Sequence, residues 1–281
     1  MRINGRHLEG GSVDLDASQS SQFVSALLMA ATQARSPVVL EVASPVSTPY
    51  VDLTVEALRR FGADLEQHTD GMGFRIRPSI LDGGDFVVEA DLSAAAYPAA
   101  GAALTGGIVT LEGLGEDSKQ GDRRFLEVLA AMGAAVDWKV SGVEVRGGER
   151  LRAVEVDFSD LPDQVPTLAA LAPHCEGRTV IRNVGHLRIK ESDRLAAMAT
   201  ELGRLGADVE EQPDGLTIEG TWHGDGTPRN PVTVETYGDH RIAMSLAVCG
   251  LRRPGVTIGT PEVVAKSYPG FWKDLELLLQ G

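Results

Sequence analysis

The stretch FLEVLAAMGAAVDWKVSGVEVRG (residues 125–147) reads as an amphipathic helix, a glycine, a strand, a tight turn and a second strand. The same pattern occurs at residues 55–77 and 198–220, so that the helix-ending glycines lie about 72 residues apart. Glycine at this position favours a left-handed helix cap, and two short apolar runs around a turn predict a β-hairpin. A pattern that recurs at one spacing indicates a fold assembled from copies of one unit.

A second pattern occurs four times and consists of a strand, a polar turn, a mostly apolar helix and another strand. Its copies begin at residues 13, 87, 154 and 232. Joined to the first pattern, it makes a βαβαββ unit, and right-handed crossovers in such units predict mixed sheets with helices on one face. The expected class is α/β (α+β), with helices apolar nearly all round enclosed by sheets. The weakest join in this pattern lies at residues 77–86, where Pro and Gly interrupt it.

Composition excludes several classes of function. The formal net charge of −14 argues against binding to nucleic acid or to a membrane surface, because both select basic faces. With no long apolar run and no signal-peptide core, we expect a cytoplasmic protein. Cys175 and Cys249 show no CxxC spacing and are predicted to be reduced core residues. The histidines show no metal-binding spacing, and neither a Walker nor a dinucleotide motif occurs, so no metal or cofactor is expected.

Cations gather where two helices are predicted to begin. In LRIKESDRLAAM (187–198), read as strand, turn and helix, Arg188, Lys190 and Arg194 crowd the helix start. The macrodipole makes that end partly positive, so cations there are unfavourable. A solvated helix start offset by nearby acids is one explanation, and a bound anion that neutralises the cations is the better one. Residues 238–241 (GDHR) repeat the arrangement.

The other polar turns have ordinary explanations beside functional ones. SQSSQF (18–23) and VSTPYVDLT (46–54) place hydroxyl groups before helices, where they can cap the helix or bind phosphate. Asp163 precedes an apolar helix, where an acid is favourable anyway but could also act as a general base. Lys266, taken by itself, reads as a surface lysine.

Taken in order, the motifs SSQF, SxPYxDxT, PD before an apolar helix, RxKESDRL, DHRxAM and AKSYPxF resemble the enolpyruvyl transferases, and most closely the EPSP synthase family. The resemblance runs from about residue 10 to 275. It implies two domains of βαβαββ units and transfer of an enolpyruvyl group from phosphoenolpyruvate to the 5-hydroxyl of shikimate 3-phosphate, without a metal or organic cofactor. The small-molecule partners implied are therefore these two anionic substrates.

The resemblance also implies residue roles. Asp163 takes the hydroxyl proton and Glu191 donates a proton to the methylene carbon. The residues implied to contact shikimate 3-phosphate are Ser20, Ser21, Gln22, Ser47, Tyr50, Asp163, His186 and Lys190. Those implied to contact phosphoenolpyruvate are Gln22, Arg194, His240, Arg241 and Lys266.

Two departures from the family pattern bear on function. His186 stands where many members carry Asn, and an imidazole that titrates near neutrality is expected to make substrate binding sensitive to pH between 6 and 8. The Gly-Ser-Lys-Ser and Asn-Ala-Gly-Thr stretches near the family's N-terminus are not found here. The chain thus resembles the C-terminal two thirds of the family, which implies one βαβαββ unit of the N-terminal domain over 1–85 and the C-terminal domain over 86–281. We expect this chain by itself to turn over very slowly or not at all.

Three other readings remain open at this stage. The chain could be a UDP-N-acetylglucosamine enolpyruvyl transferase, although KESDR and DHRxAM favour the shikimate enzyme. It could be one subunit of a split enzyme, complemented by a separate N-terminal segment, rather than a monomer. It could also be a binding module that keeps the fold without the activity.

Overall fold

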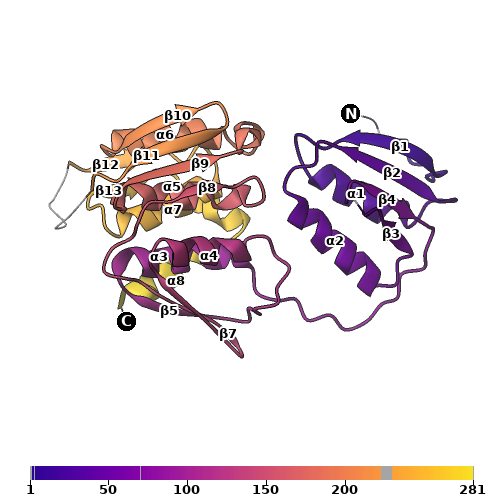
Figure 1. Ribbon diagram of the computed structural model, residues 1–281, viewed down its shortest axis with the longest axis horizontal. Helices are drawn as coiled ribbons and strands as arrows, with labels where there is room; N and C mark the ends of the chain where they lie inside the picture. The colour runs from indigo at the N-terminus through magenta and orange to yellow at the C-terminus, as the bar shows by residue number, and fades with distance from the viewer. Residues whose placement is uncertain (1, 3, 70, 223–229, 281) are drawn as a thin grey trace. The chain divides into compact units, whose positions relative to one another are not determined.

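The computed structural model describes residues 2, 4–69, 71–222 and 230–280, and the chain divides into two compact units. Unit 1 comprises residues 1–88 and 119–121, and unit 2 comprises residues 89–118 and 122–281. Figure 1 shows their helices and strands. Within the described residues, each helix is too short or too polar to cross a lipid bilayer.

Unit 1 is one complete βαβαββ unit. Its elements are β1 (Gly11–Asp16), α1 (Gln22–Ala31), β2 (Val38–Ala43), α2 (Thr48–Arg60), β3 (Leu65–Gln67) and β4 (Gly73–Ile76). The sheet order is β1-β2-β4-β3, in which β1 and β2 are parallel and the other neighbours antiparallel. The two helices pack on each other, and Thr54 on α2 donates a hydrogen bond to Ser25 on α1 at 2.8 Å.

Unit 2 repeats this connectivity. Its helices are α3 (Leu92–Thr105), α4 (Arg123–Ala131), α5 (Val165–Leu171), α6 (Arg194–Arg204), α7 (His240–Gly250) and α8 (Phe271–Gln280). Its strands are β5 (Ile108–Glu112), β6 (Ala135–Lys139), β7 (Gly142–Arg146), β8 (Glu155–Asp157), β9 (Arg178–Arg182), β10 (Asp208–Gln212), β11 (Gly215–Glu219), β12 (Val232–Val234) and β13 (Val256–Ile258). They form sheets of order β5-β7-β6, β10-β11-β9-β8 and β12-β13. The described residues of the unit also form the 3₁₀ helices η1 (Pro162–Gln164), η2 (Ala172–His174), η3 (Gly185–Ile189) and η4 (Pro261–Lys266).

The repeat predicted from glycine spacing is confirmed. Gly62, Gly133 and Gly206 follow their helices with φ of +84°, +111° and +88°, the left-handed region that glycine enters without strain. An antiparallel hairpin follows each glycine: β3–β4, β6–β7 and β10–β11. The parallel pairs β1–β2 and β8–β9 make their two four-stranded sheets mixed, and the predicted α/β class with mixed sheets is correct.

Two local predictions were wrong. The strand expected at residues 87–90 does not form: Val87 and Val88 are 88% and 78% exposed, although Ala90 donates its N–H to the carbonyl of Gly113, just after β5, at 2.9 Å. The strand expected at residues 187–190 is instead η3, whose Leu187 is fully buried. Apolar residues predict burial in both segments, but a strand forms only where its backbone pairs with a neighbouring edge.

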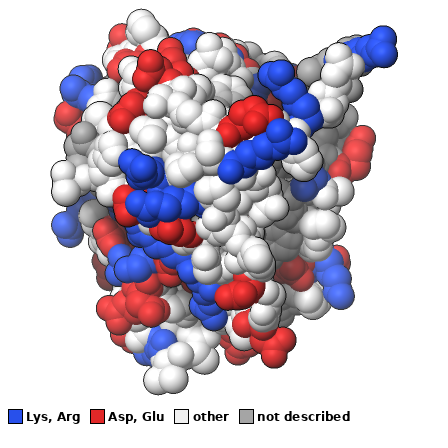
Figure 2. All heavy atoms as spheres, turned by 90° about the vertical axis from the view of Figure 1, so that its right-hand side faces the viewer, with Lys and Arg blue, Asp and Glu red and all other residues white. Residues whose placement is uncertain are grey.

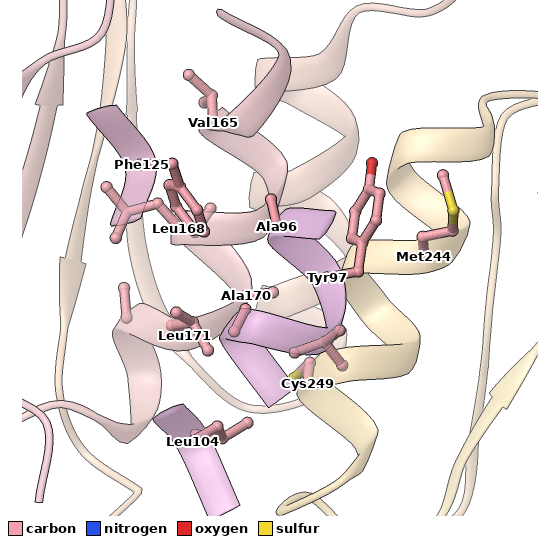
Figure 3. Packing of buried hydrophobic residues seen from close by; sticks show 14 of the residues in the cluster. Ala96, Tyr97, Leu104, Phe125, Val165, Leu168, Ala170, Leu171, Met244 and Cys249 are labelled. Carbon is pink, nitrogen blue, oxygen red and sulfur yellow. The ribbon is translucent and has the colours of Figure 1, made fainter. Parts of the chain in front are cut away.

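Three helices of unit 2 form its centre. α3, α5 and α7 pack against one another (Figure 1), and Figure 3 shows Ala96 of α3 and Ala170 of α5 in this core. Small residues of these helices, among them Ala99, Ala100 and Ala169, are fully buried. Close packing of this kind requires side chains that fit together without voids. Cys175 and Cys249 are buried free thiols in this core, and burial raises the pKa of each to about 12, which suits the predicted inert role.

The three central helices run parallel. At one end, Gln164, just before α5, donates to the Ser93 carbonyl in the first turn of α3 at 3.4 Å. At the other end, Arg252, just after α7, donates to the Leu104 carbonyl near the end of α3 at 3.2 Å. The N-termini of all three helices therefore lie at the same end of unit 2, and their dipoles add to make it favourable for negative charge.

Candidate anion-binding site

Arg194 lies at the centre of an ion-pair network at this end of unit 2. It is the first residue of α6 and only 2% exposed. Its Nε donates to Asp239 Oδ2 at 2.8 Å, its Nη1 to Asp163 Oδ1 at 2.8 Å and its Nη2 to Glu191 Oε2 at 2.9 Å. One guanidinium thus binds three carboxylates through all three of its nitrogens, an arrangement that suits its rigid planar fork.

Two more cations extend the network. Arg241, in the first turn of α7, donates to Asp163 Oδ2 at 2.7 Å, and Lys266, at the end of η4, pairs with Glu191. Charges therefore alternate along the line Lys266, Glu191, Arg194, Asp163, Arg241. Residues separated by up to 103 positions in the chain meet here because the starts of α5, α6 and α7 share one end of the unit.

The local sequence explains how these helix starts tolerate cations. Asp239 is the N-cap of α7 and accepts a hydrogen bond from the Arg241 backbone N–H at 2.9 Å. Asp193 caps α6 in the same way, accepting from Ala196 N–H at 3.0 Å. Asp193, one of the acids predicted to offset the cations, thus acts as a helix cap, and Asp239 has the same role at α7.

Carboxylates of the protein itself supply part of the negative charge that the sequence predicts beside these cations. Arg188 points to Asp193 and Glu211, at 3.0 and 2.7 Å, and its other nitrogens bind backbone carbonyls, so it serves the local structure. Lys190 follows η3 and precedes the cap of α6, so Lys190 and Arg194 are not an i,i+4 pair on one helix. Among the described residues, Lys190 makes no ion pair within 4.0 Å.

The network controls the protonation of its acids. Partial burial would raise the pKa of the Glu191 carboxyl, but the partners Lys266 and Arg194 outweigh burial and lower it to about 2. Burial likewise opposes ionisation of Asp163, yet Arg241 and Arg194 hold its pKa below the usual value. Both carboxyl groups are therefore ionised at neutral pH in this structure, and each is a weak base while its cations remain in place.

Three further predicted residues border the network. Burial lowers the pKa of His186 below its ordinary 6.5, with the nearby Lys190 acting in the same direction. Burial also lowers the pKa of His240, whose Nδ1 lies 3.7 Å from Asp239, and of Lys190. Burial therefore favours the neutral imidazole of His186, which moves the expected pH sensitivity of substrate binding toward lower pH; that sensitivity stays a prediction.

Two residues of this site were not predicted. Asp239 is fully buried and anchors Arg194, and its only signal in the sequence was its place ahead of a helix. Tyr97 comes from the middle of α3, is 1% exposed and accepts a hydrogen bond from Arg241 Nη1 at 3.5 Å. Figure 3 shows its ring standing between α3 and α7, next to Met244. A single polar group within an apolar helix was the only sign that Tyr97 could reach the network.

The remaining predicted residues belong to unit 1. Ser20 and Ser21 precede α1, Gln22 begins it, Ser47 precedes α2 and Tyr50 lies in its first turn. Neither Ser21 nor Ser47 forms the side-chain cap that the ordinary explanation required, whereas Ser20 accepts a hydrogen bond from the Gln22 N–H at 3.2 Å. Ser21 and the start of α2 line the same small cavity of about 20 Å³, so these two polar turns lie close together.

Comparison with known proteins identifies the family. The family described as EPSP synthase (3-phosphoshikimate 1-carboxyvinyltransferase) matches residues 1–275. The chain belongs to the EPSP synthase family. A relative from Syntrophobacter fumaroxidans named 3-phosphoshikimate 1-carboxyvinyltransferase is 47% identical over 280 residues, covering 99% of this chain and 65% of the relative. A relative of the same name from Methanothrix thermoacetophila is 44% identical, over 98% of this chain and 64% of the relative.

Solved structures agree with this family assignment. An EPSP synthase from Acinetobacter baumannii superposes with a TM-score of 0.81 at 32% identity, over 98% of this chain and 63% of that one. The enolpyruvyl transferase NikO from Streptomyces tendae superposes with a TM-score of 0.72 at 22% identity, over 97% of this chain and 65% of NikO, and so shares the fold. This EPSP synthase family chain therefore spans just under two thirds of the length of the relatives that it matches.

Proposed function

We propose that this chain takes part in the transfer of the enolpyruvyl group from phosphoenolpyruvate to the 5-hydroxyl of shikimate 3-phosphate, with release of phosphate. The observation that carries the proposal is the Arg194 network. It places several cations and carboxylates at the shared N-terminal end of three helices, in a chain of the EPSP synthase family. Cations are needed there for anionic substrates, and carboxylates for proton transfer.

Arg194, Arg241 and Lys266 bind the phosphate and carboxylate of phosphoenolpyruvate in this proposal, with His240 and Gln22 as further contacts. A phosphate group presents several acceptor oxygens to a guanidinium and forms charge-assisted hydrogen bonds with it. Each cation already pairs with a carboxylate, so substrate binding is an exchange of partners. The exchange lets the substrate bind without leaving a buried cation unpaired at any stage.

Shikimate 3-phosphate is recognised by neutral and charged groups together. The side chains assigned to it are Ser20, Ser21, Gln22, Ser47, Tyr50, Asp163, His186 and Lys190. Hydroxyl and amide groups suit the hydroxyls of the ring, and Lys190 and the helix-start N–H groups suit its phosphate.

The chemistry assigns one proton to each carboxyl group. Asp163 accepts the proton of the 5-hydroxyl of shikimate 3-phosphate while that hydroxyl oxygen forms a bond to C2 of phosphoenolpyruvate. Glu191 protonates C3 of phosphoenolpyruvate, which converts the methylene to a methyl group. Loss of a methyl proton and of phosphate from this tetrahedral intermediate gives the enol ether. Such general acid and base groups contribute typically about 10²–10⁴-fold to a rate.

Glu191 must gain a proton before it can donate one. With a pKa of about 2 it is ionised in the structure described here, because Lys266 and Arg194 stabilise its charge. When substrate anions engage those cations, the pKa of Glu191 is expected to rise toward its ordinary value of 4.5 or beyond. Substrate binding thereby prepares the acid.

The proposal is tested by binding and by turnover. Calorimetry with shikimate 3-phosphate and phosphoenolpyruvate should show binding that Arg241→Met weakens and that Arg178→Met, which removes an exposed cation paired with Glu219, leaves unchanged. Phosphate release, which is expected to be very slow for this chain by itself, should require both substrates, and Asp163→Asn should slow it further. Binding of UDP-N-acetylglucosamine in place of shikimate 3-phosphate, or no binding of either anion, would contradict the proposal.

A further inference from the structure

Tyr237 adopts an unusual backbone conformation just before the network. Its φ of +55° lies in the left-handed region, which bulky side chains rarely enter because Cβ crowds the backbone. It ends the segment that leads from β12 into α7, and the next residues are Gly238 and the buried cap Asp239. A strained residue persists only where its surroundings hold it, and such residues concentrate at functional sites.

The side chain of Tyr237 shows what holds it. Its hydroxyl donates to Glu201 Oε1 at 2.8 Å. Glu201 is 1% exposed, and its other oxygen accepts from the Glu235 backbone N–H at 3.2 Å and from Arg204. Arg204 in turn donates to the Thr233 carbonyl at 2.9 Å. A buried carboxylate on α6 thus binds the segment 233–237 through both of its oxygens.

Glu201 and Arg194 share one face of α6. They are seven residues apart, close to two helical turns, so both side chains face the segment that precedes α7. α6 is therefore fastened to that segment at two levels, by Glu201 to Tyr237 and Glu235, and by Arg194 to Asp239 at 2.8 Å. The hydrogen bonds of Glu201 to Tyr237 and Glu235 restrain the position of α6 along its axis and its rotation about that axis, and so the geometry with which Arg194 meets Asp239.

We propose that Tyr237 and Glu201 are positioning residues, which hold Asp239 against Arg194 and so fix the centre of the ion-pair network. Neither residue is needed to touch a substrate. The inference rests on the proposed function for its effect on turnover, while its effect on the network can be measured without turnover.

Two variants of Tyr237 separate positioning from simple stabilisation. Tyr237→Phe removes the hydrogen bond and keeps the strained side chain. Tyr237→Gly removes both the bond and the strain, since glycine enters this region freely, so it should unfold at a higher denaturant concentration than the Phe variant. Positioning predicts that both variants lose turnover to a similar extent, about 10–100-fold in kcat, because both lose the hydrogen bond from Tyr237 to Glu201 that holds the turn next to Asp239.

The measurement that does not need turnover is the pKa of Asp163, followed by NMR of its carboxyl carbon. In both variants it should rise toward its ordinary value, because Arg194 no longer meets Asp163 at a fixed distance. Tyr268→Phe is the control: it removes a tyrosine hydrogen bond of 2.9 Å to Asp274, which takes no part in the ion-pair network, and should leave the pKa of Asp163 unchanged.

The outcomes are distinct. An unchanged Asp163 pKa in Tyr237→Phe would overturn the inference, and so would turnover that follows stability, with the Gly variant more active than the Phe variant. If the unaltered chain binds neither substrate and releases no phosphate, the proposed function fails, and the NMR titration still decides whether Tyr237 positions the network.

Discussion

The first helices of two repeats, α1 in unit 1 and α3 in unit 2, hold the same place in the βαβαββ pattern but have different surroundings. Both are rich in apolar residues all round. In α3 nine residues are buried, and in α1 three are, while Phe23 and Met29 are 50% and 53% exposed. The difference teaches that an apolar helix is enclosed only where other helices of the same unit pack around it, as α5 and α7 do around α3.

The charges of the two units differ in the same way. In unit 1, Arg77 pairs with Asp64 and Glu66, at 2.8 and 2.9 Å, and all three side chains are at least 36% exposed. In unit 2, Arg194 is 2% exposed and its partner Asp239 is fully buried. Water screens the first cluster and not the second, so similar distances imply different energies.

The largest effect is expected from the buried cluster. Arg194→Met should lower the free energy of unfolding of unit 2 by about 3–5 kcal/mol, because it leaves buried carboxylates without their cation. Arg77→Met should change stability little. All three tryptophans (138, 222 and 272) lie in unit 2, so fluorescence during urea unfolding reports that unit by itself. Equal effects of the two substitutions would show that the two clusters do not differ as their burial suggests.

A smaller effect should separate the two helices. Ala100→Val in α3 places extra methyl groups in a filled core and should destabilise unit 2 by about 1–3 kcal/mol. The same change at the exposed Ala26 of α1 should cost only roughly 0.5 kcal/mol of helix propensity. Circular dichroism during urea unfolding follows both units. A loss at Ala26 as large as that at Ala100 would mean that the outer face of α1 is packed in solution.

The third effect concerns acid, and solvent screening at the partly exposed Glu191 makes it the smallest. The folded-state pKa of Glu191, about 2, lies below its ordinary 4.5, so its stabilising contribution is complete above pH 4.5 and is lost as pH falls from 4.5 to 2. Glu191→Gln cannot titrate and should lack this part of the acid sensitivity. Thermal midpoints of unit 2, read by tryptophan fluorescence at several pH values in this range, should therefore fall more steeply in the unaltered chain. Parallel pH curves for the two proteins would contradict the assigned pKa.

Much of the repeat architecture could be read from local patterns. Glycine after a helix and alternating apolar residues around a turn identified three hairpins, because left-handed caps and strand pairing depend on nearby residues. The strand expected at 87–90 failed because pairing depends on a distant edge. Asp239 and Tyr97 escaped prediction for the same reason, since one looked like a helix cap and the other like a core residue.

The sequence by itself determined the family, the repeated unit and the presence of cations at helix starts, since these depend on residue types at fixed spacings. Only the tertiary structure decided which charges meet. It turned Arg188 toward local partners, enclosed Arg194 among three carboxylates and placed Glu201 against Tyr237. Ion-pair energies depend on distance and burial, and packing sets both of these between residues far apart in the chain.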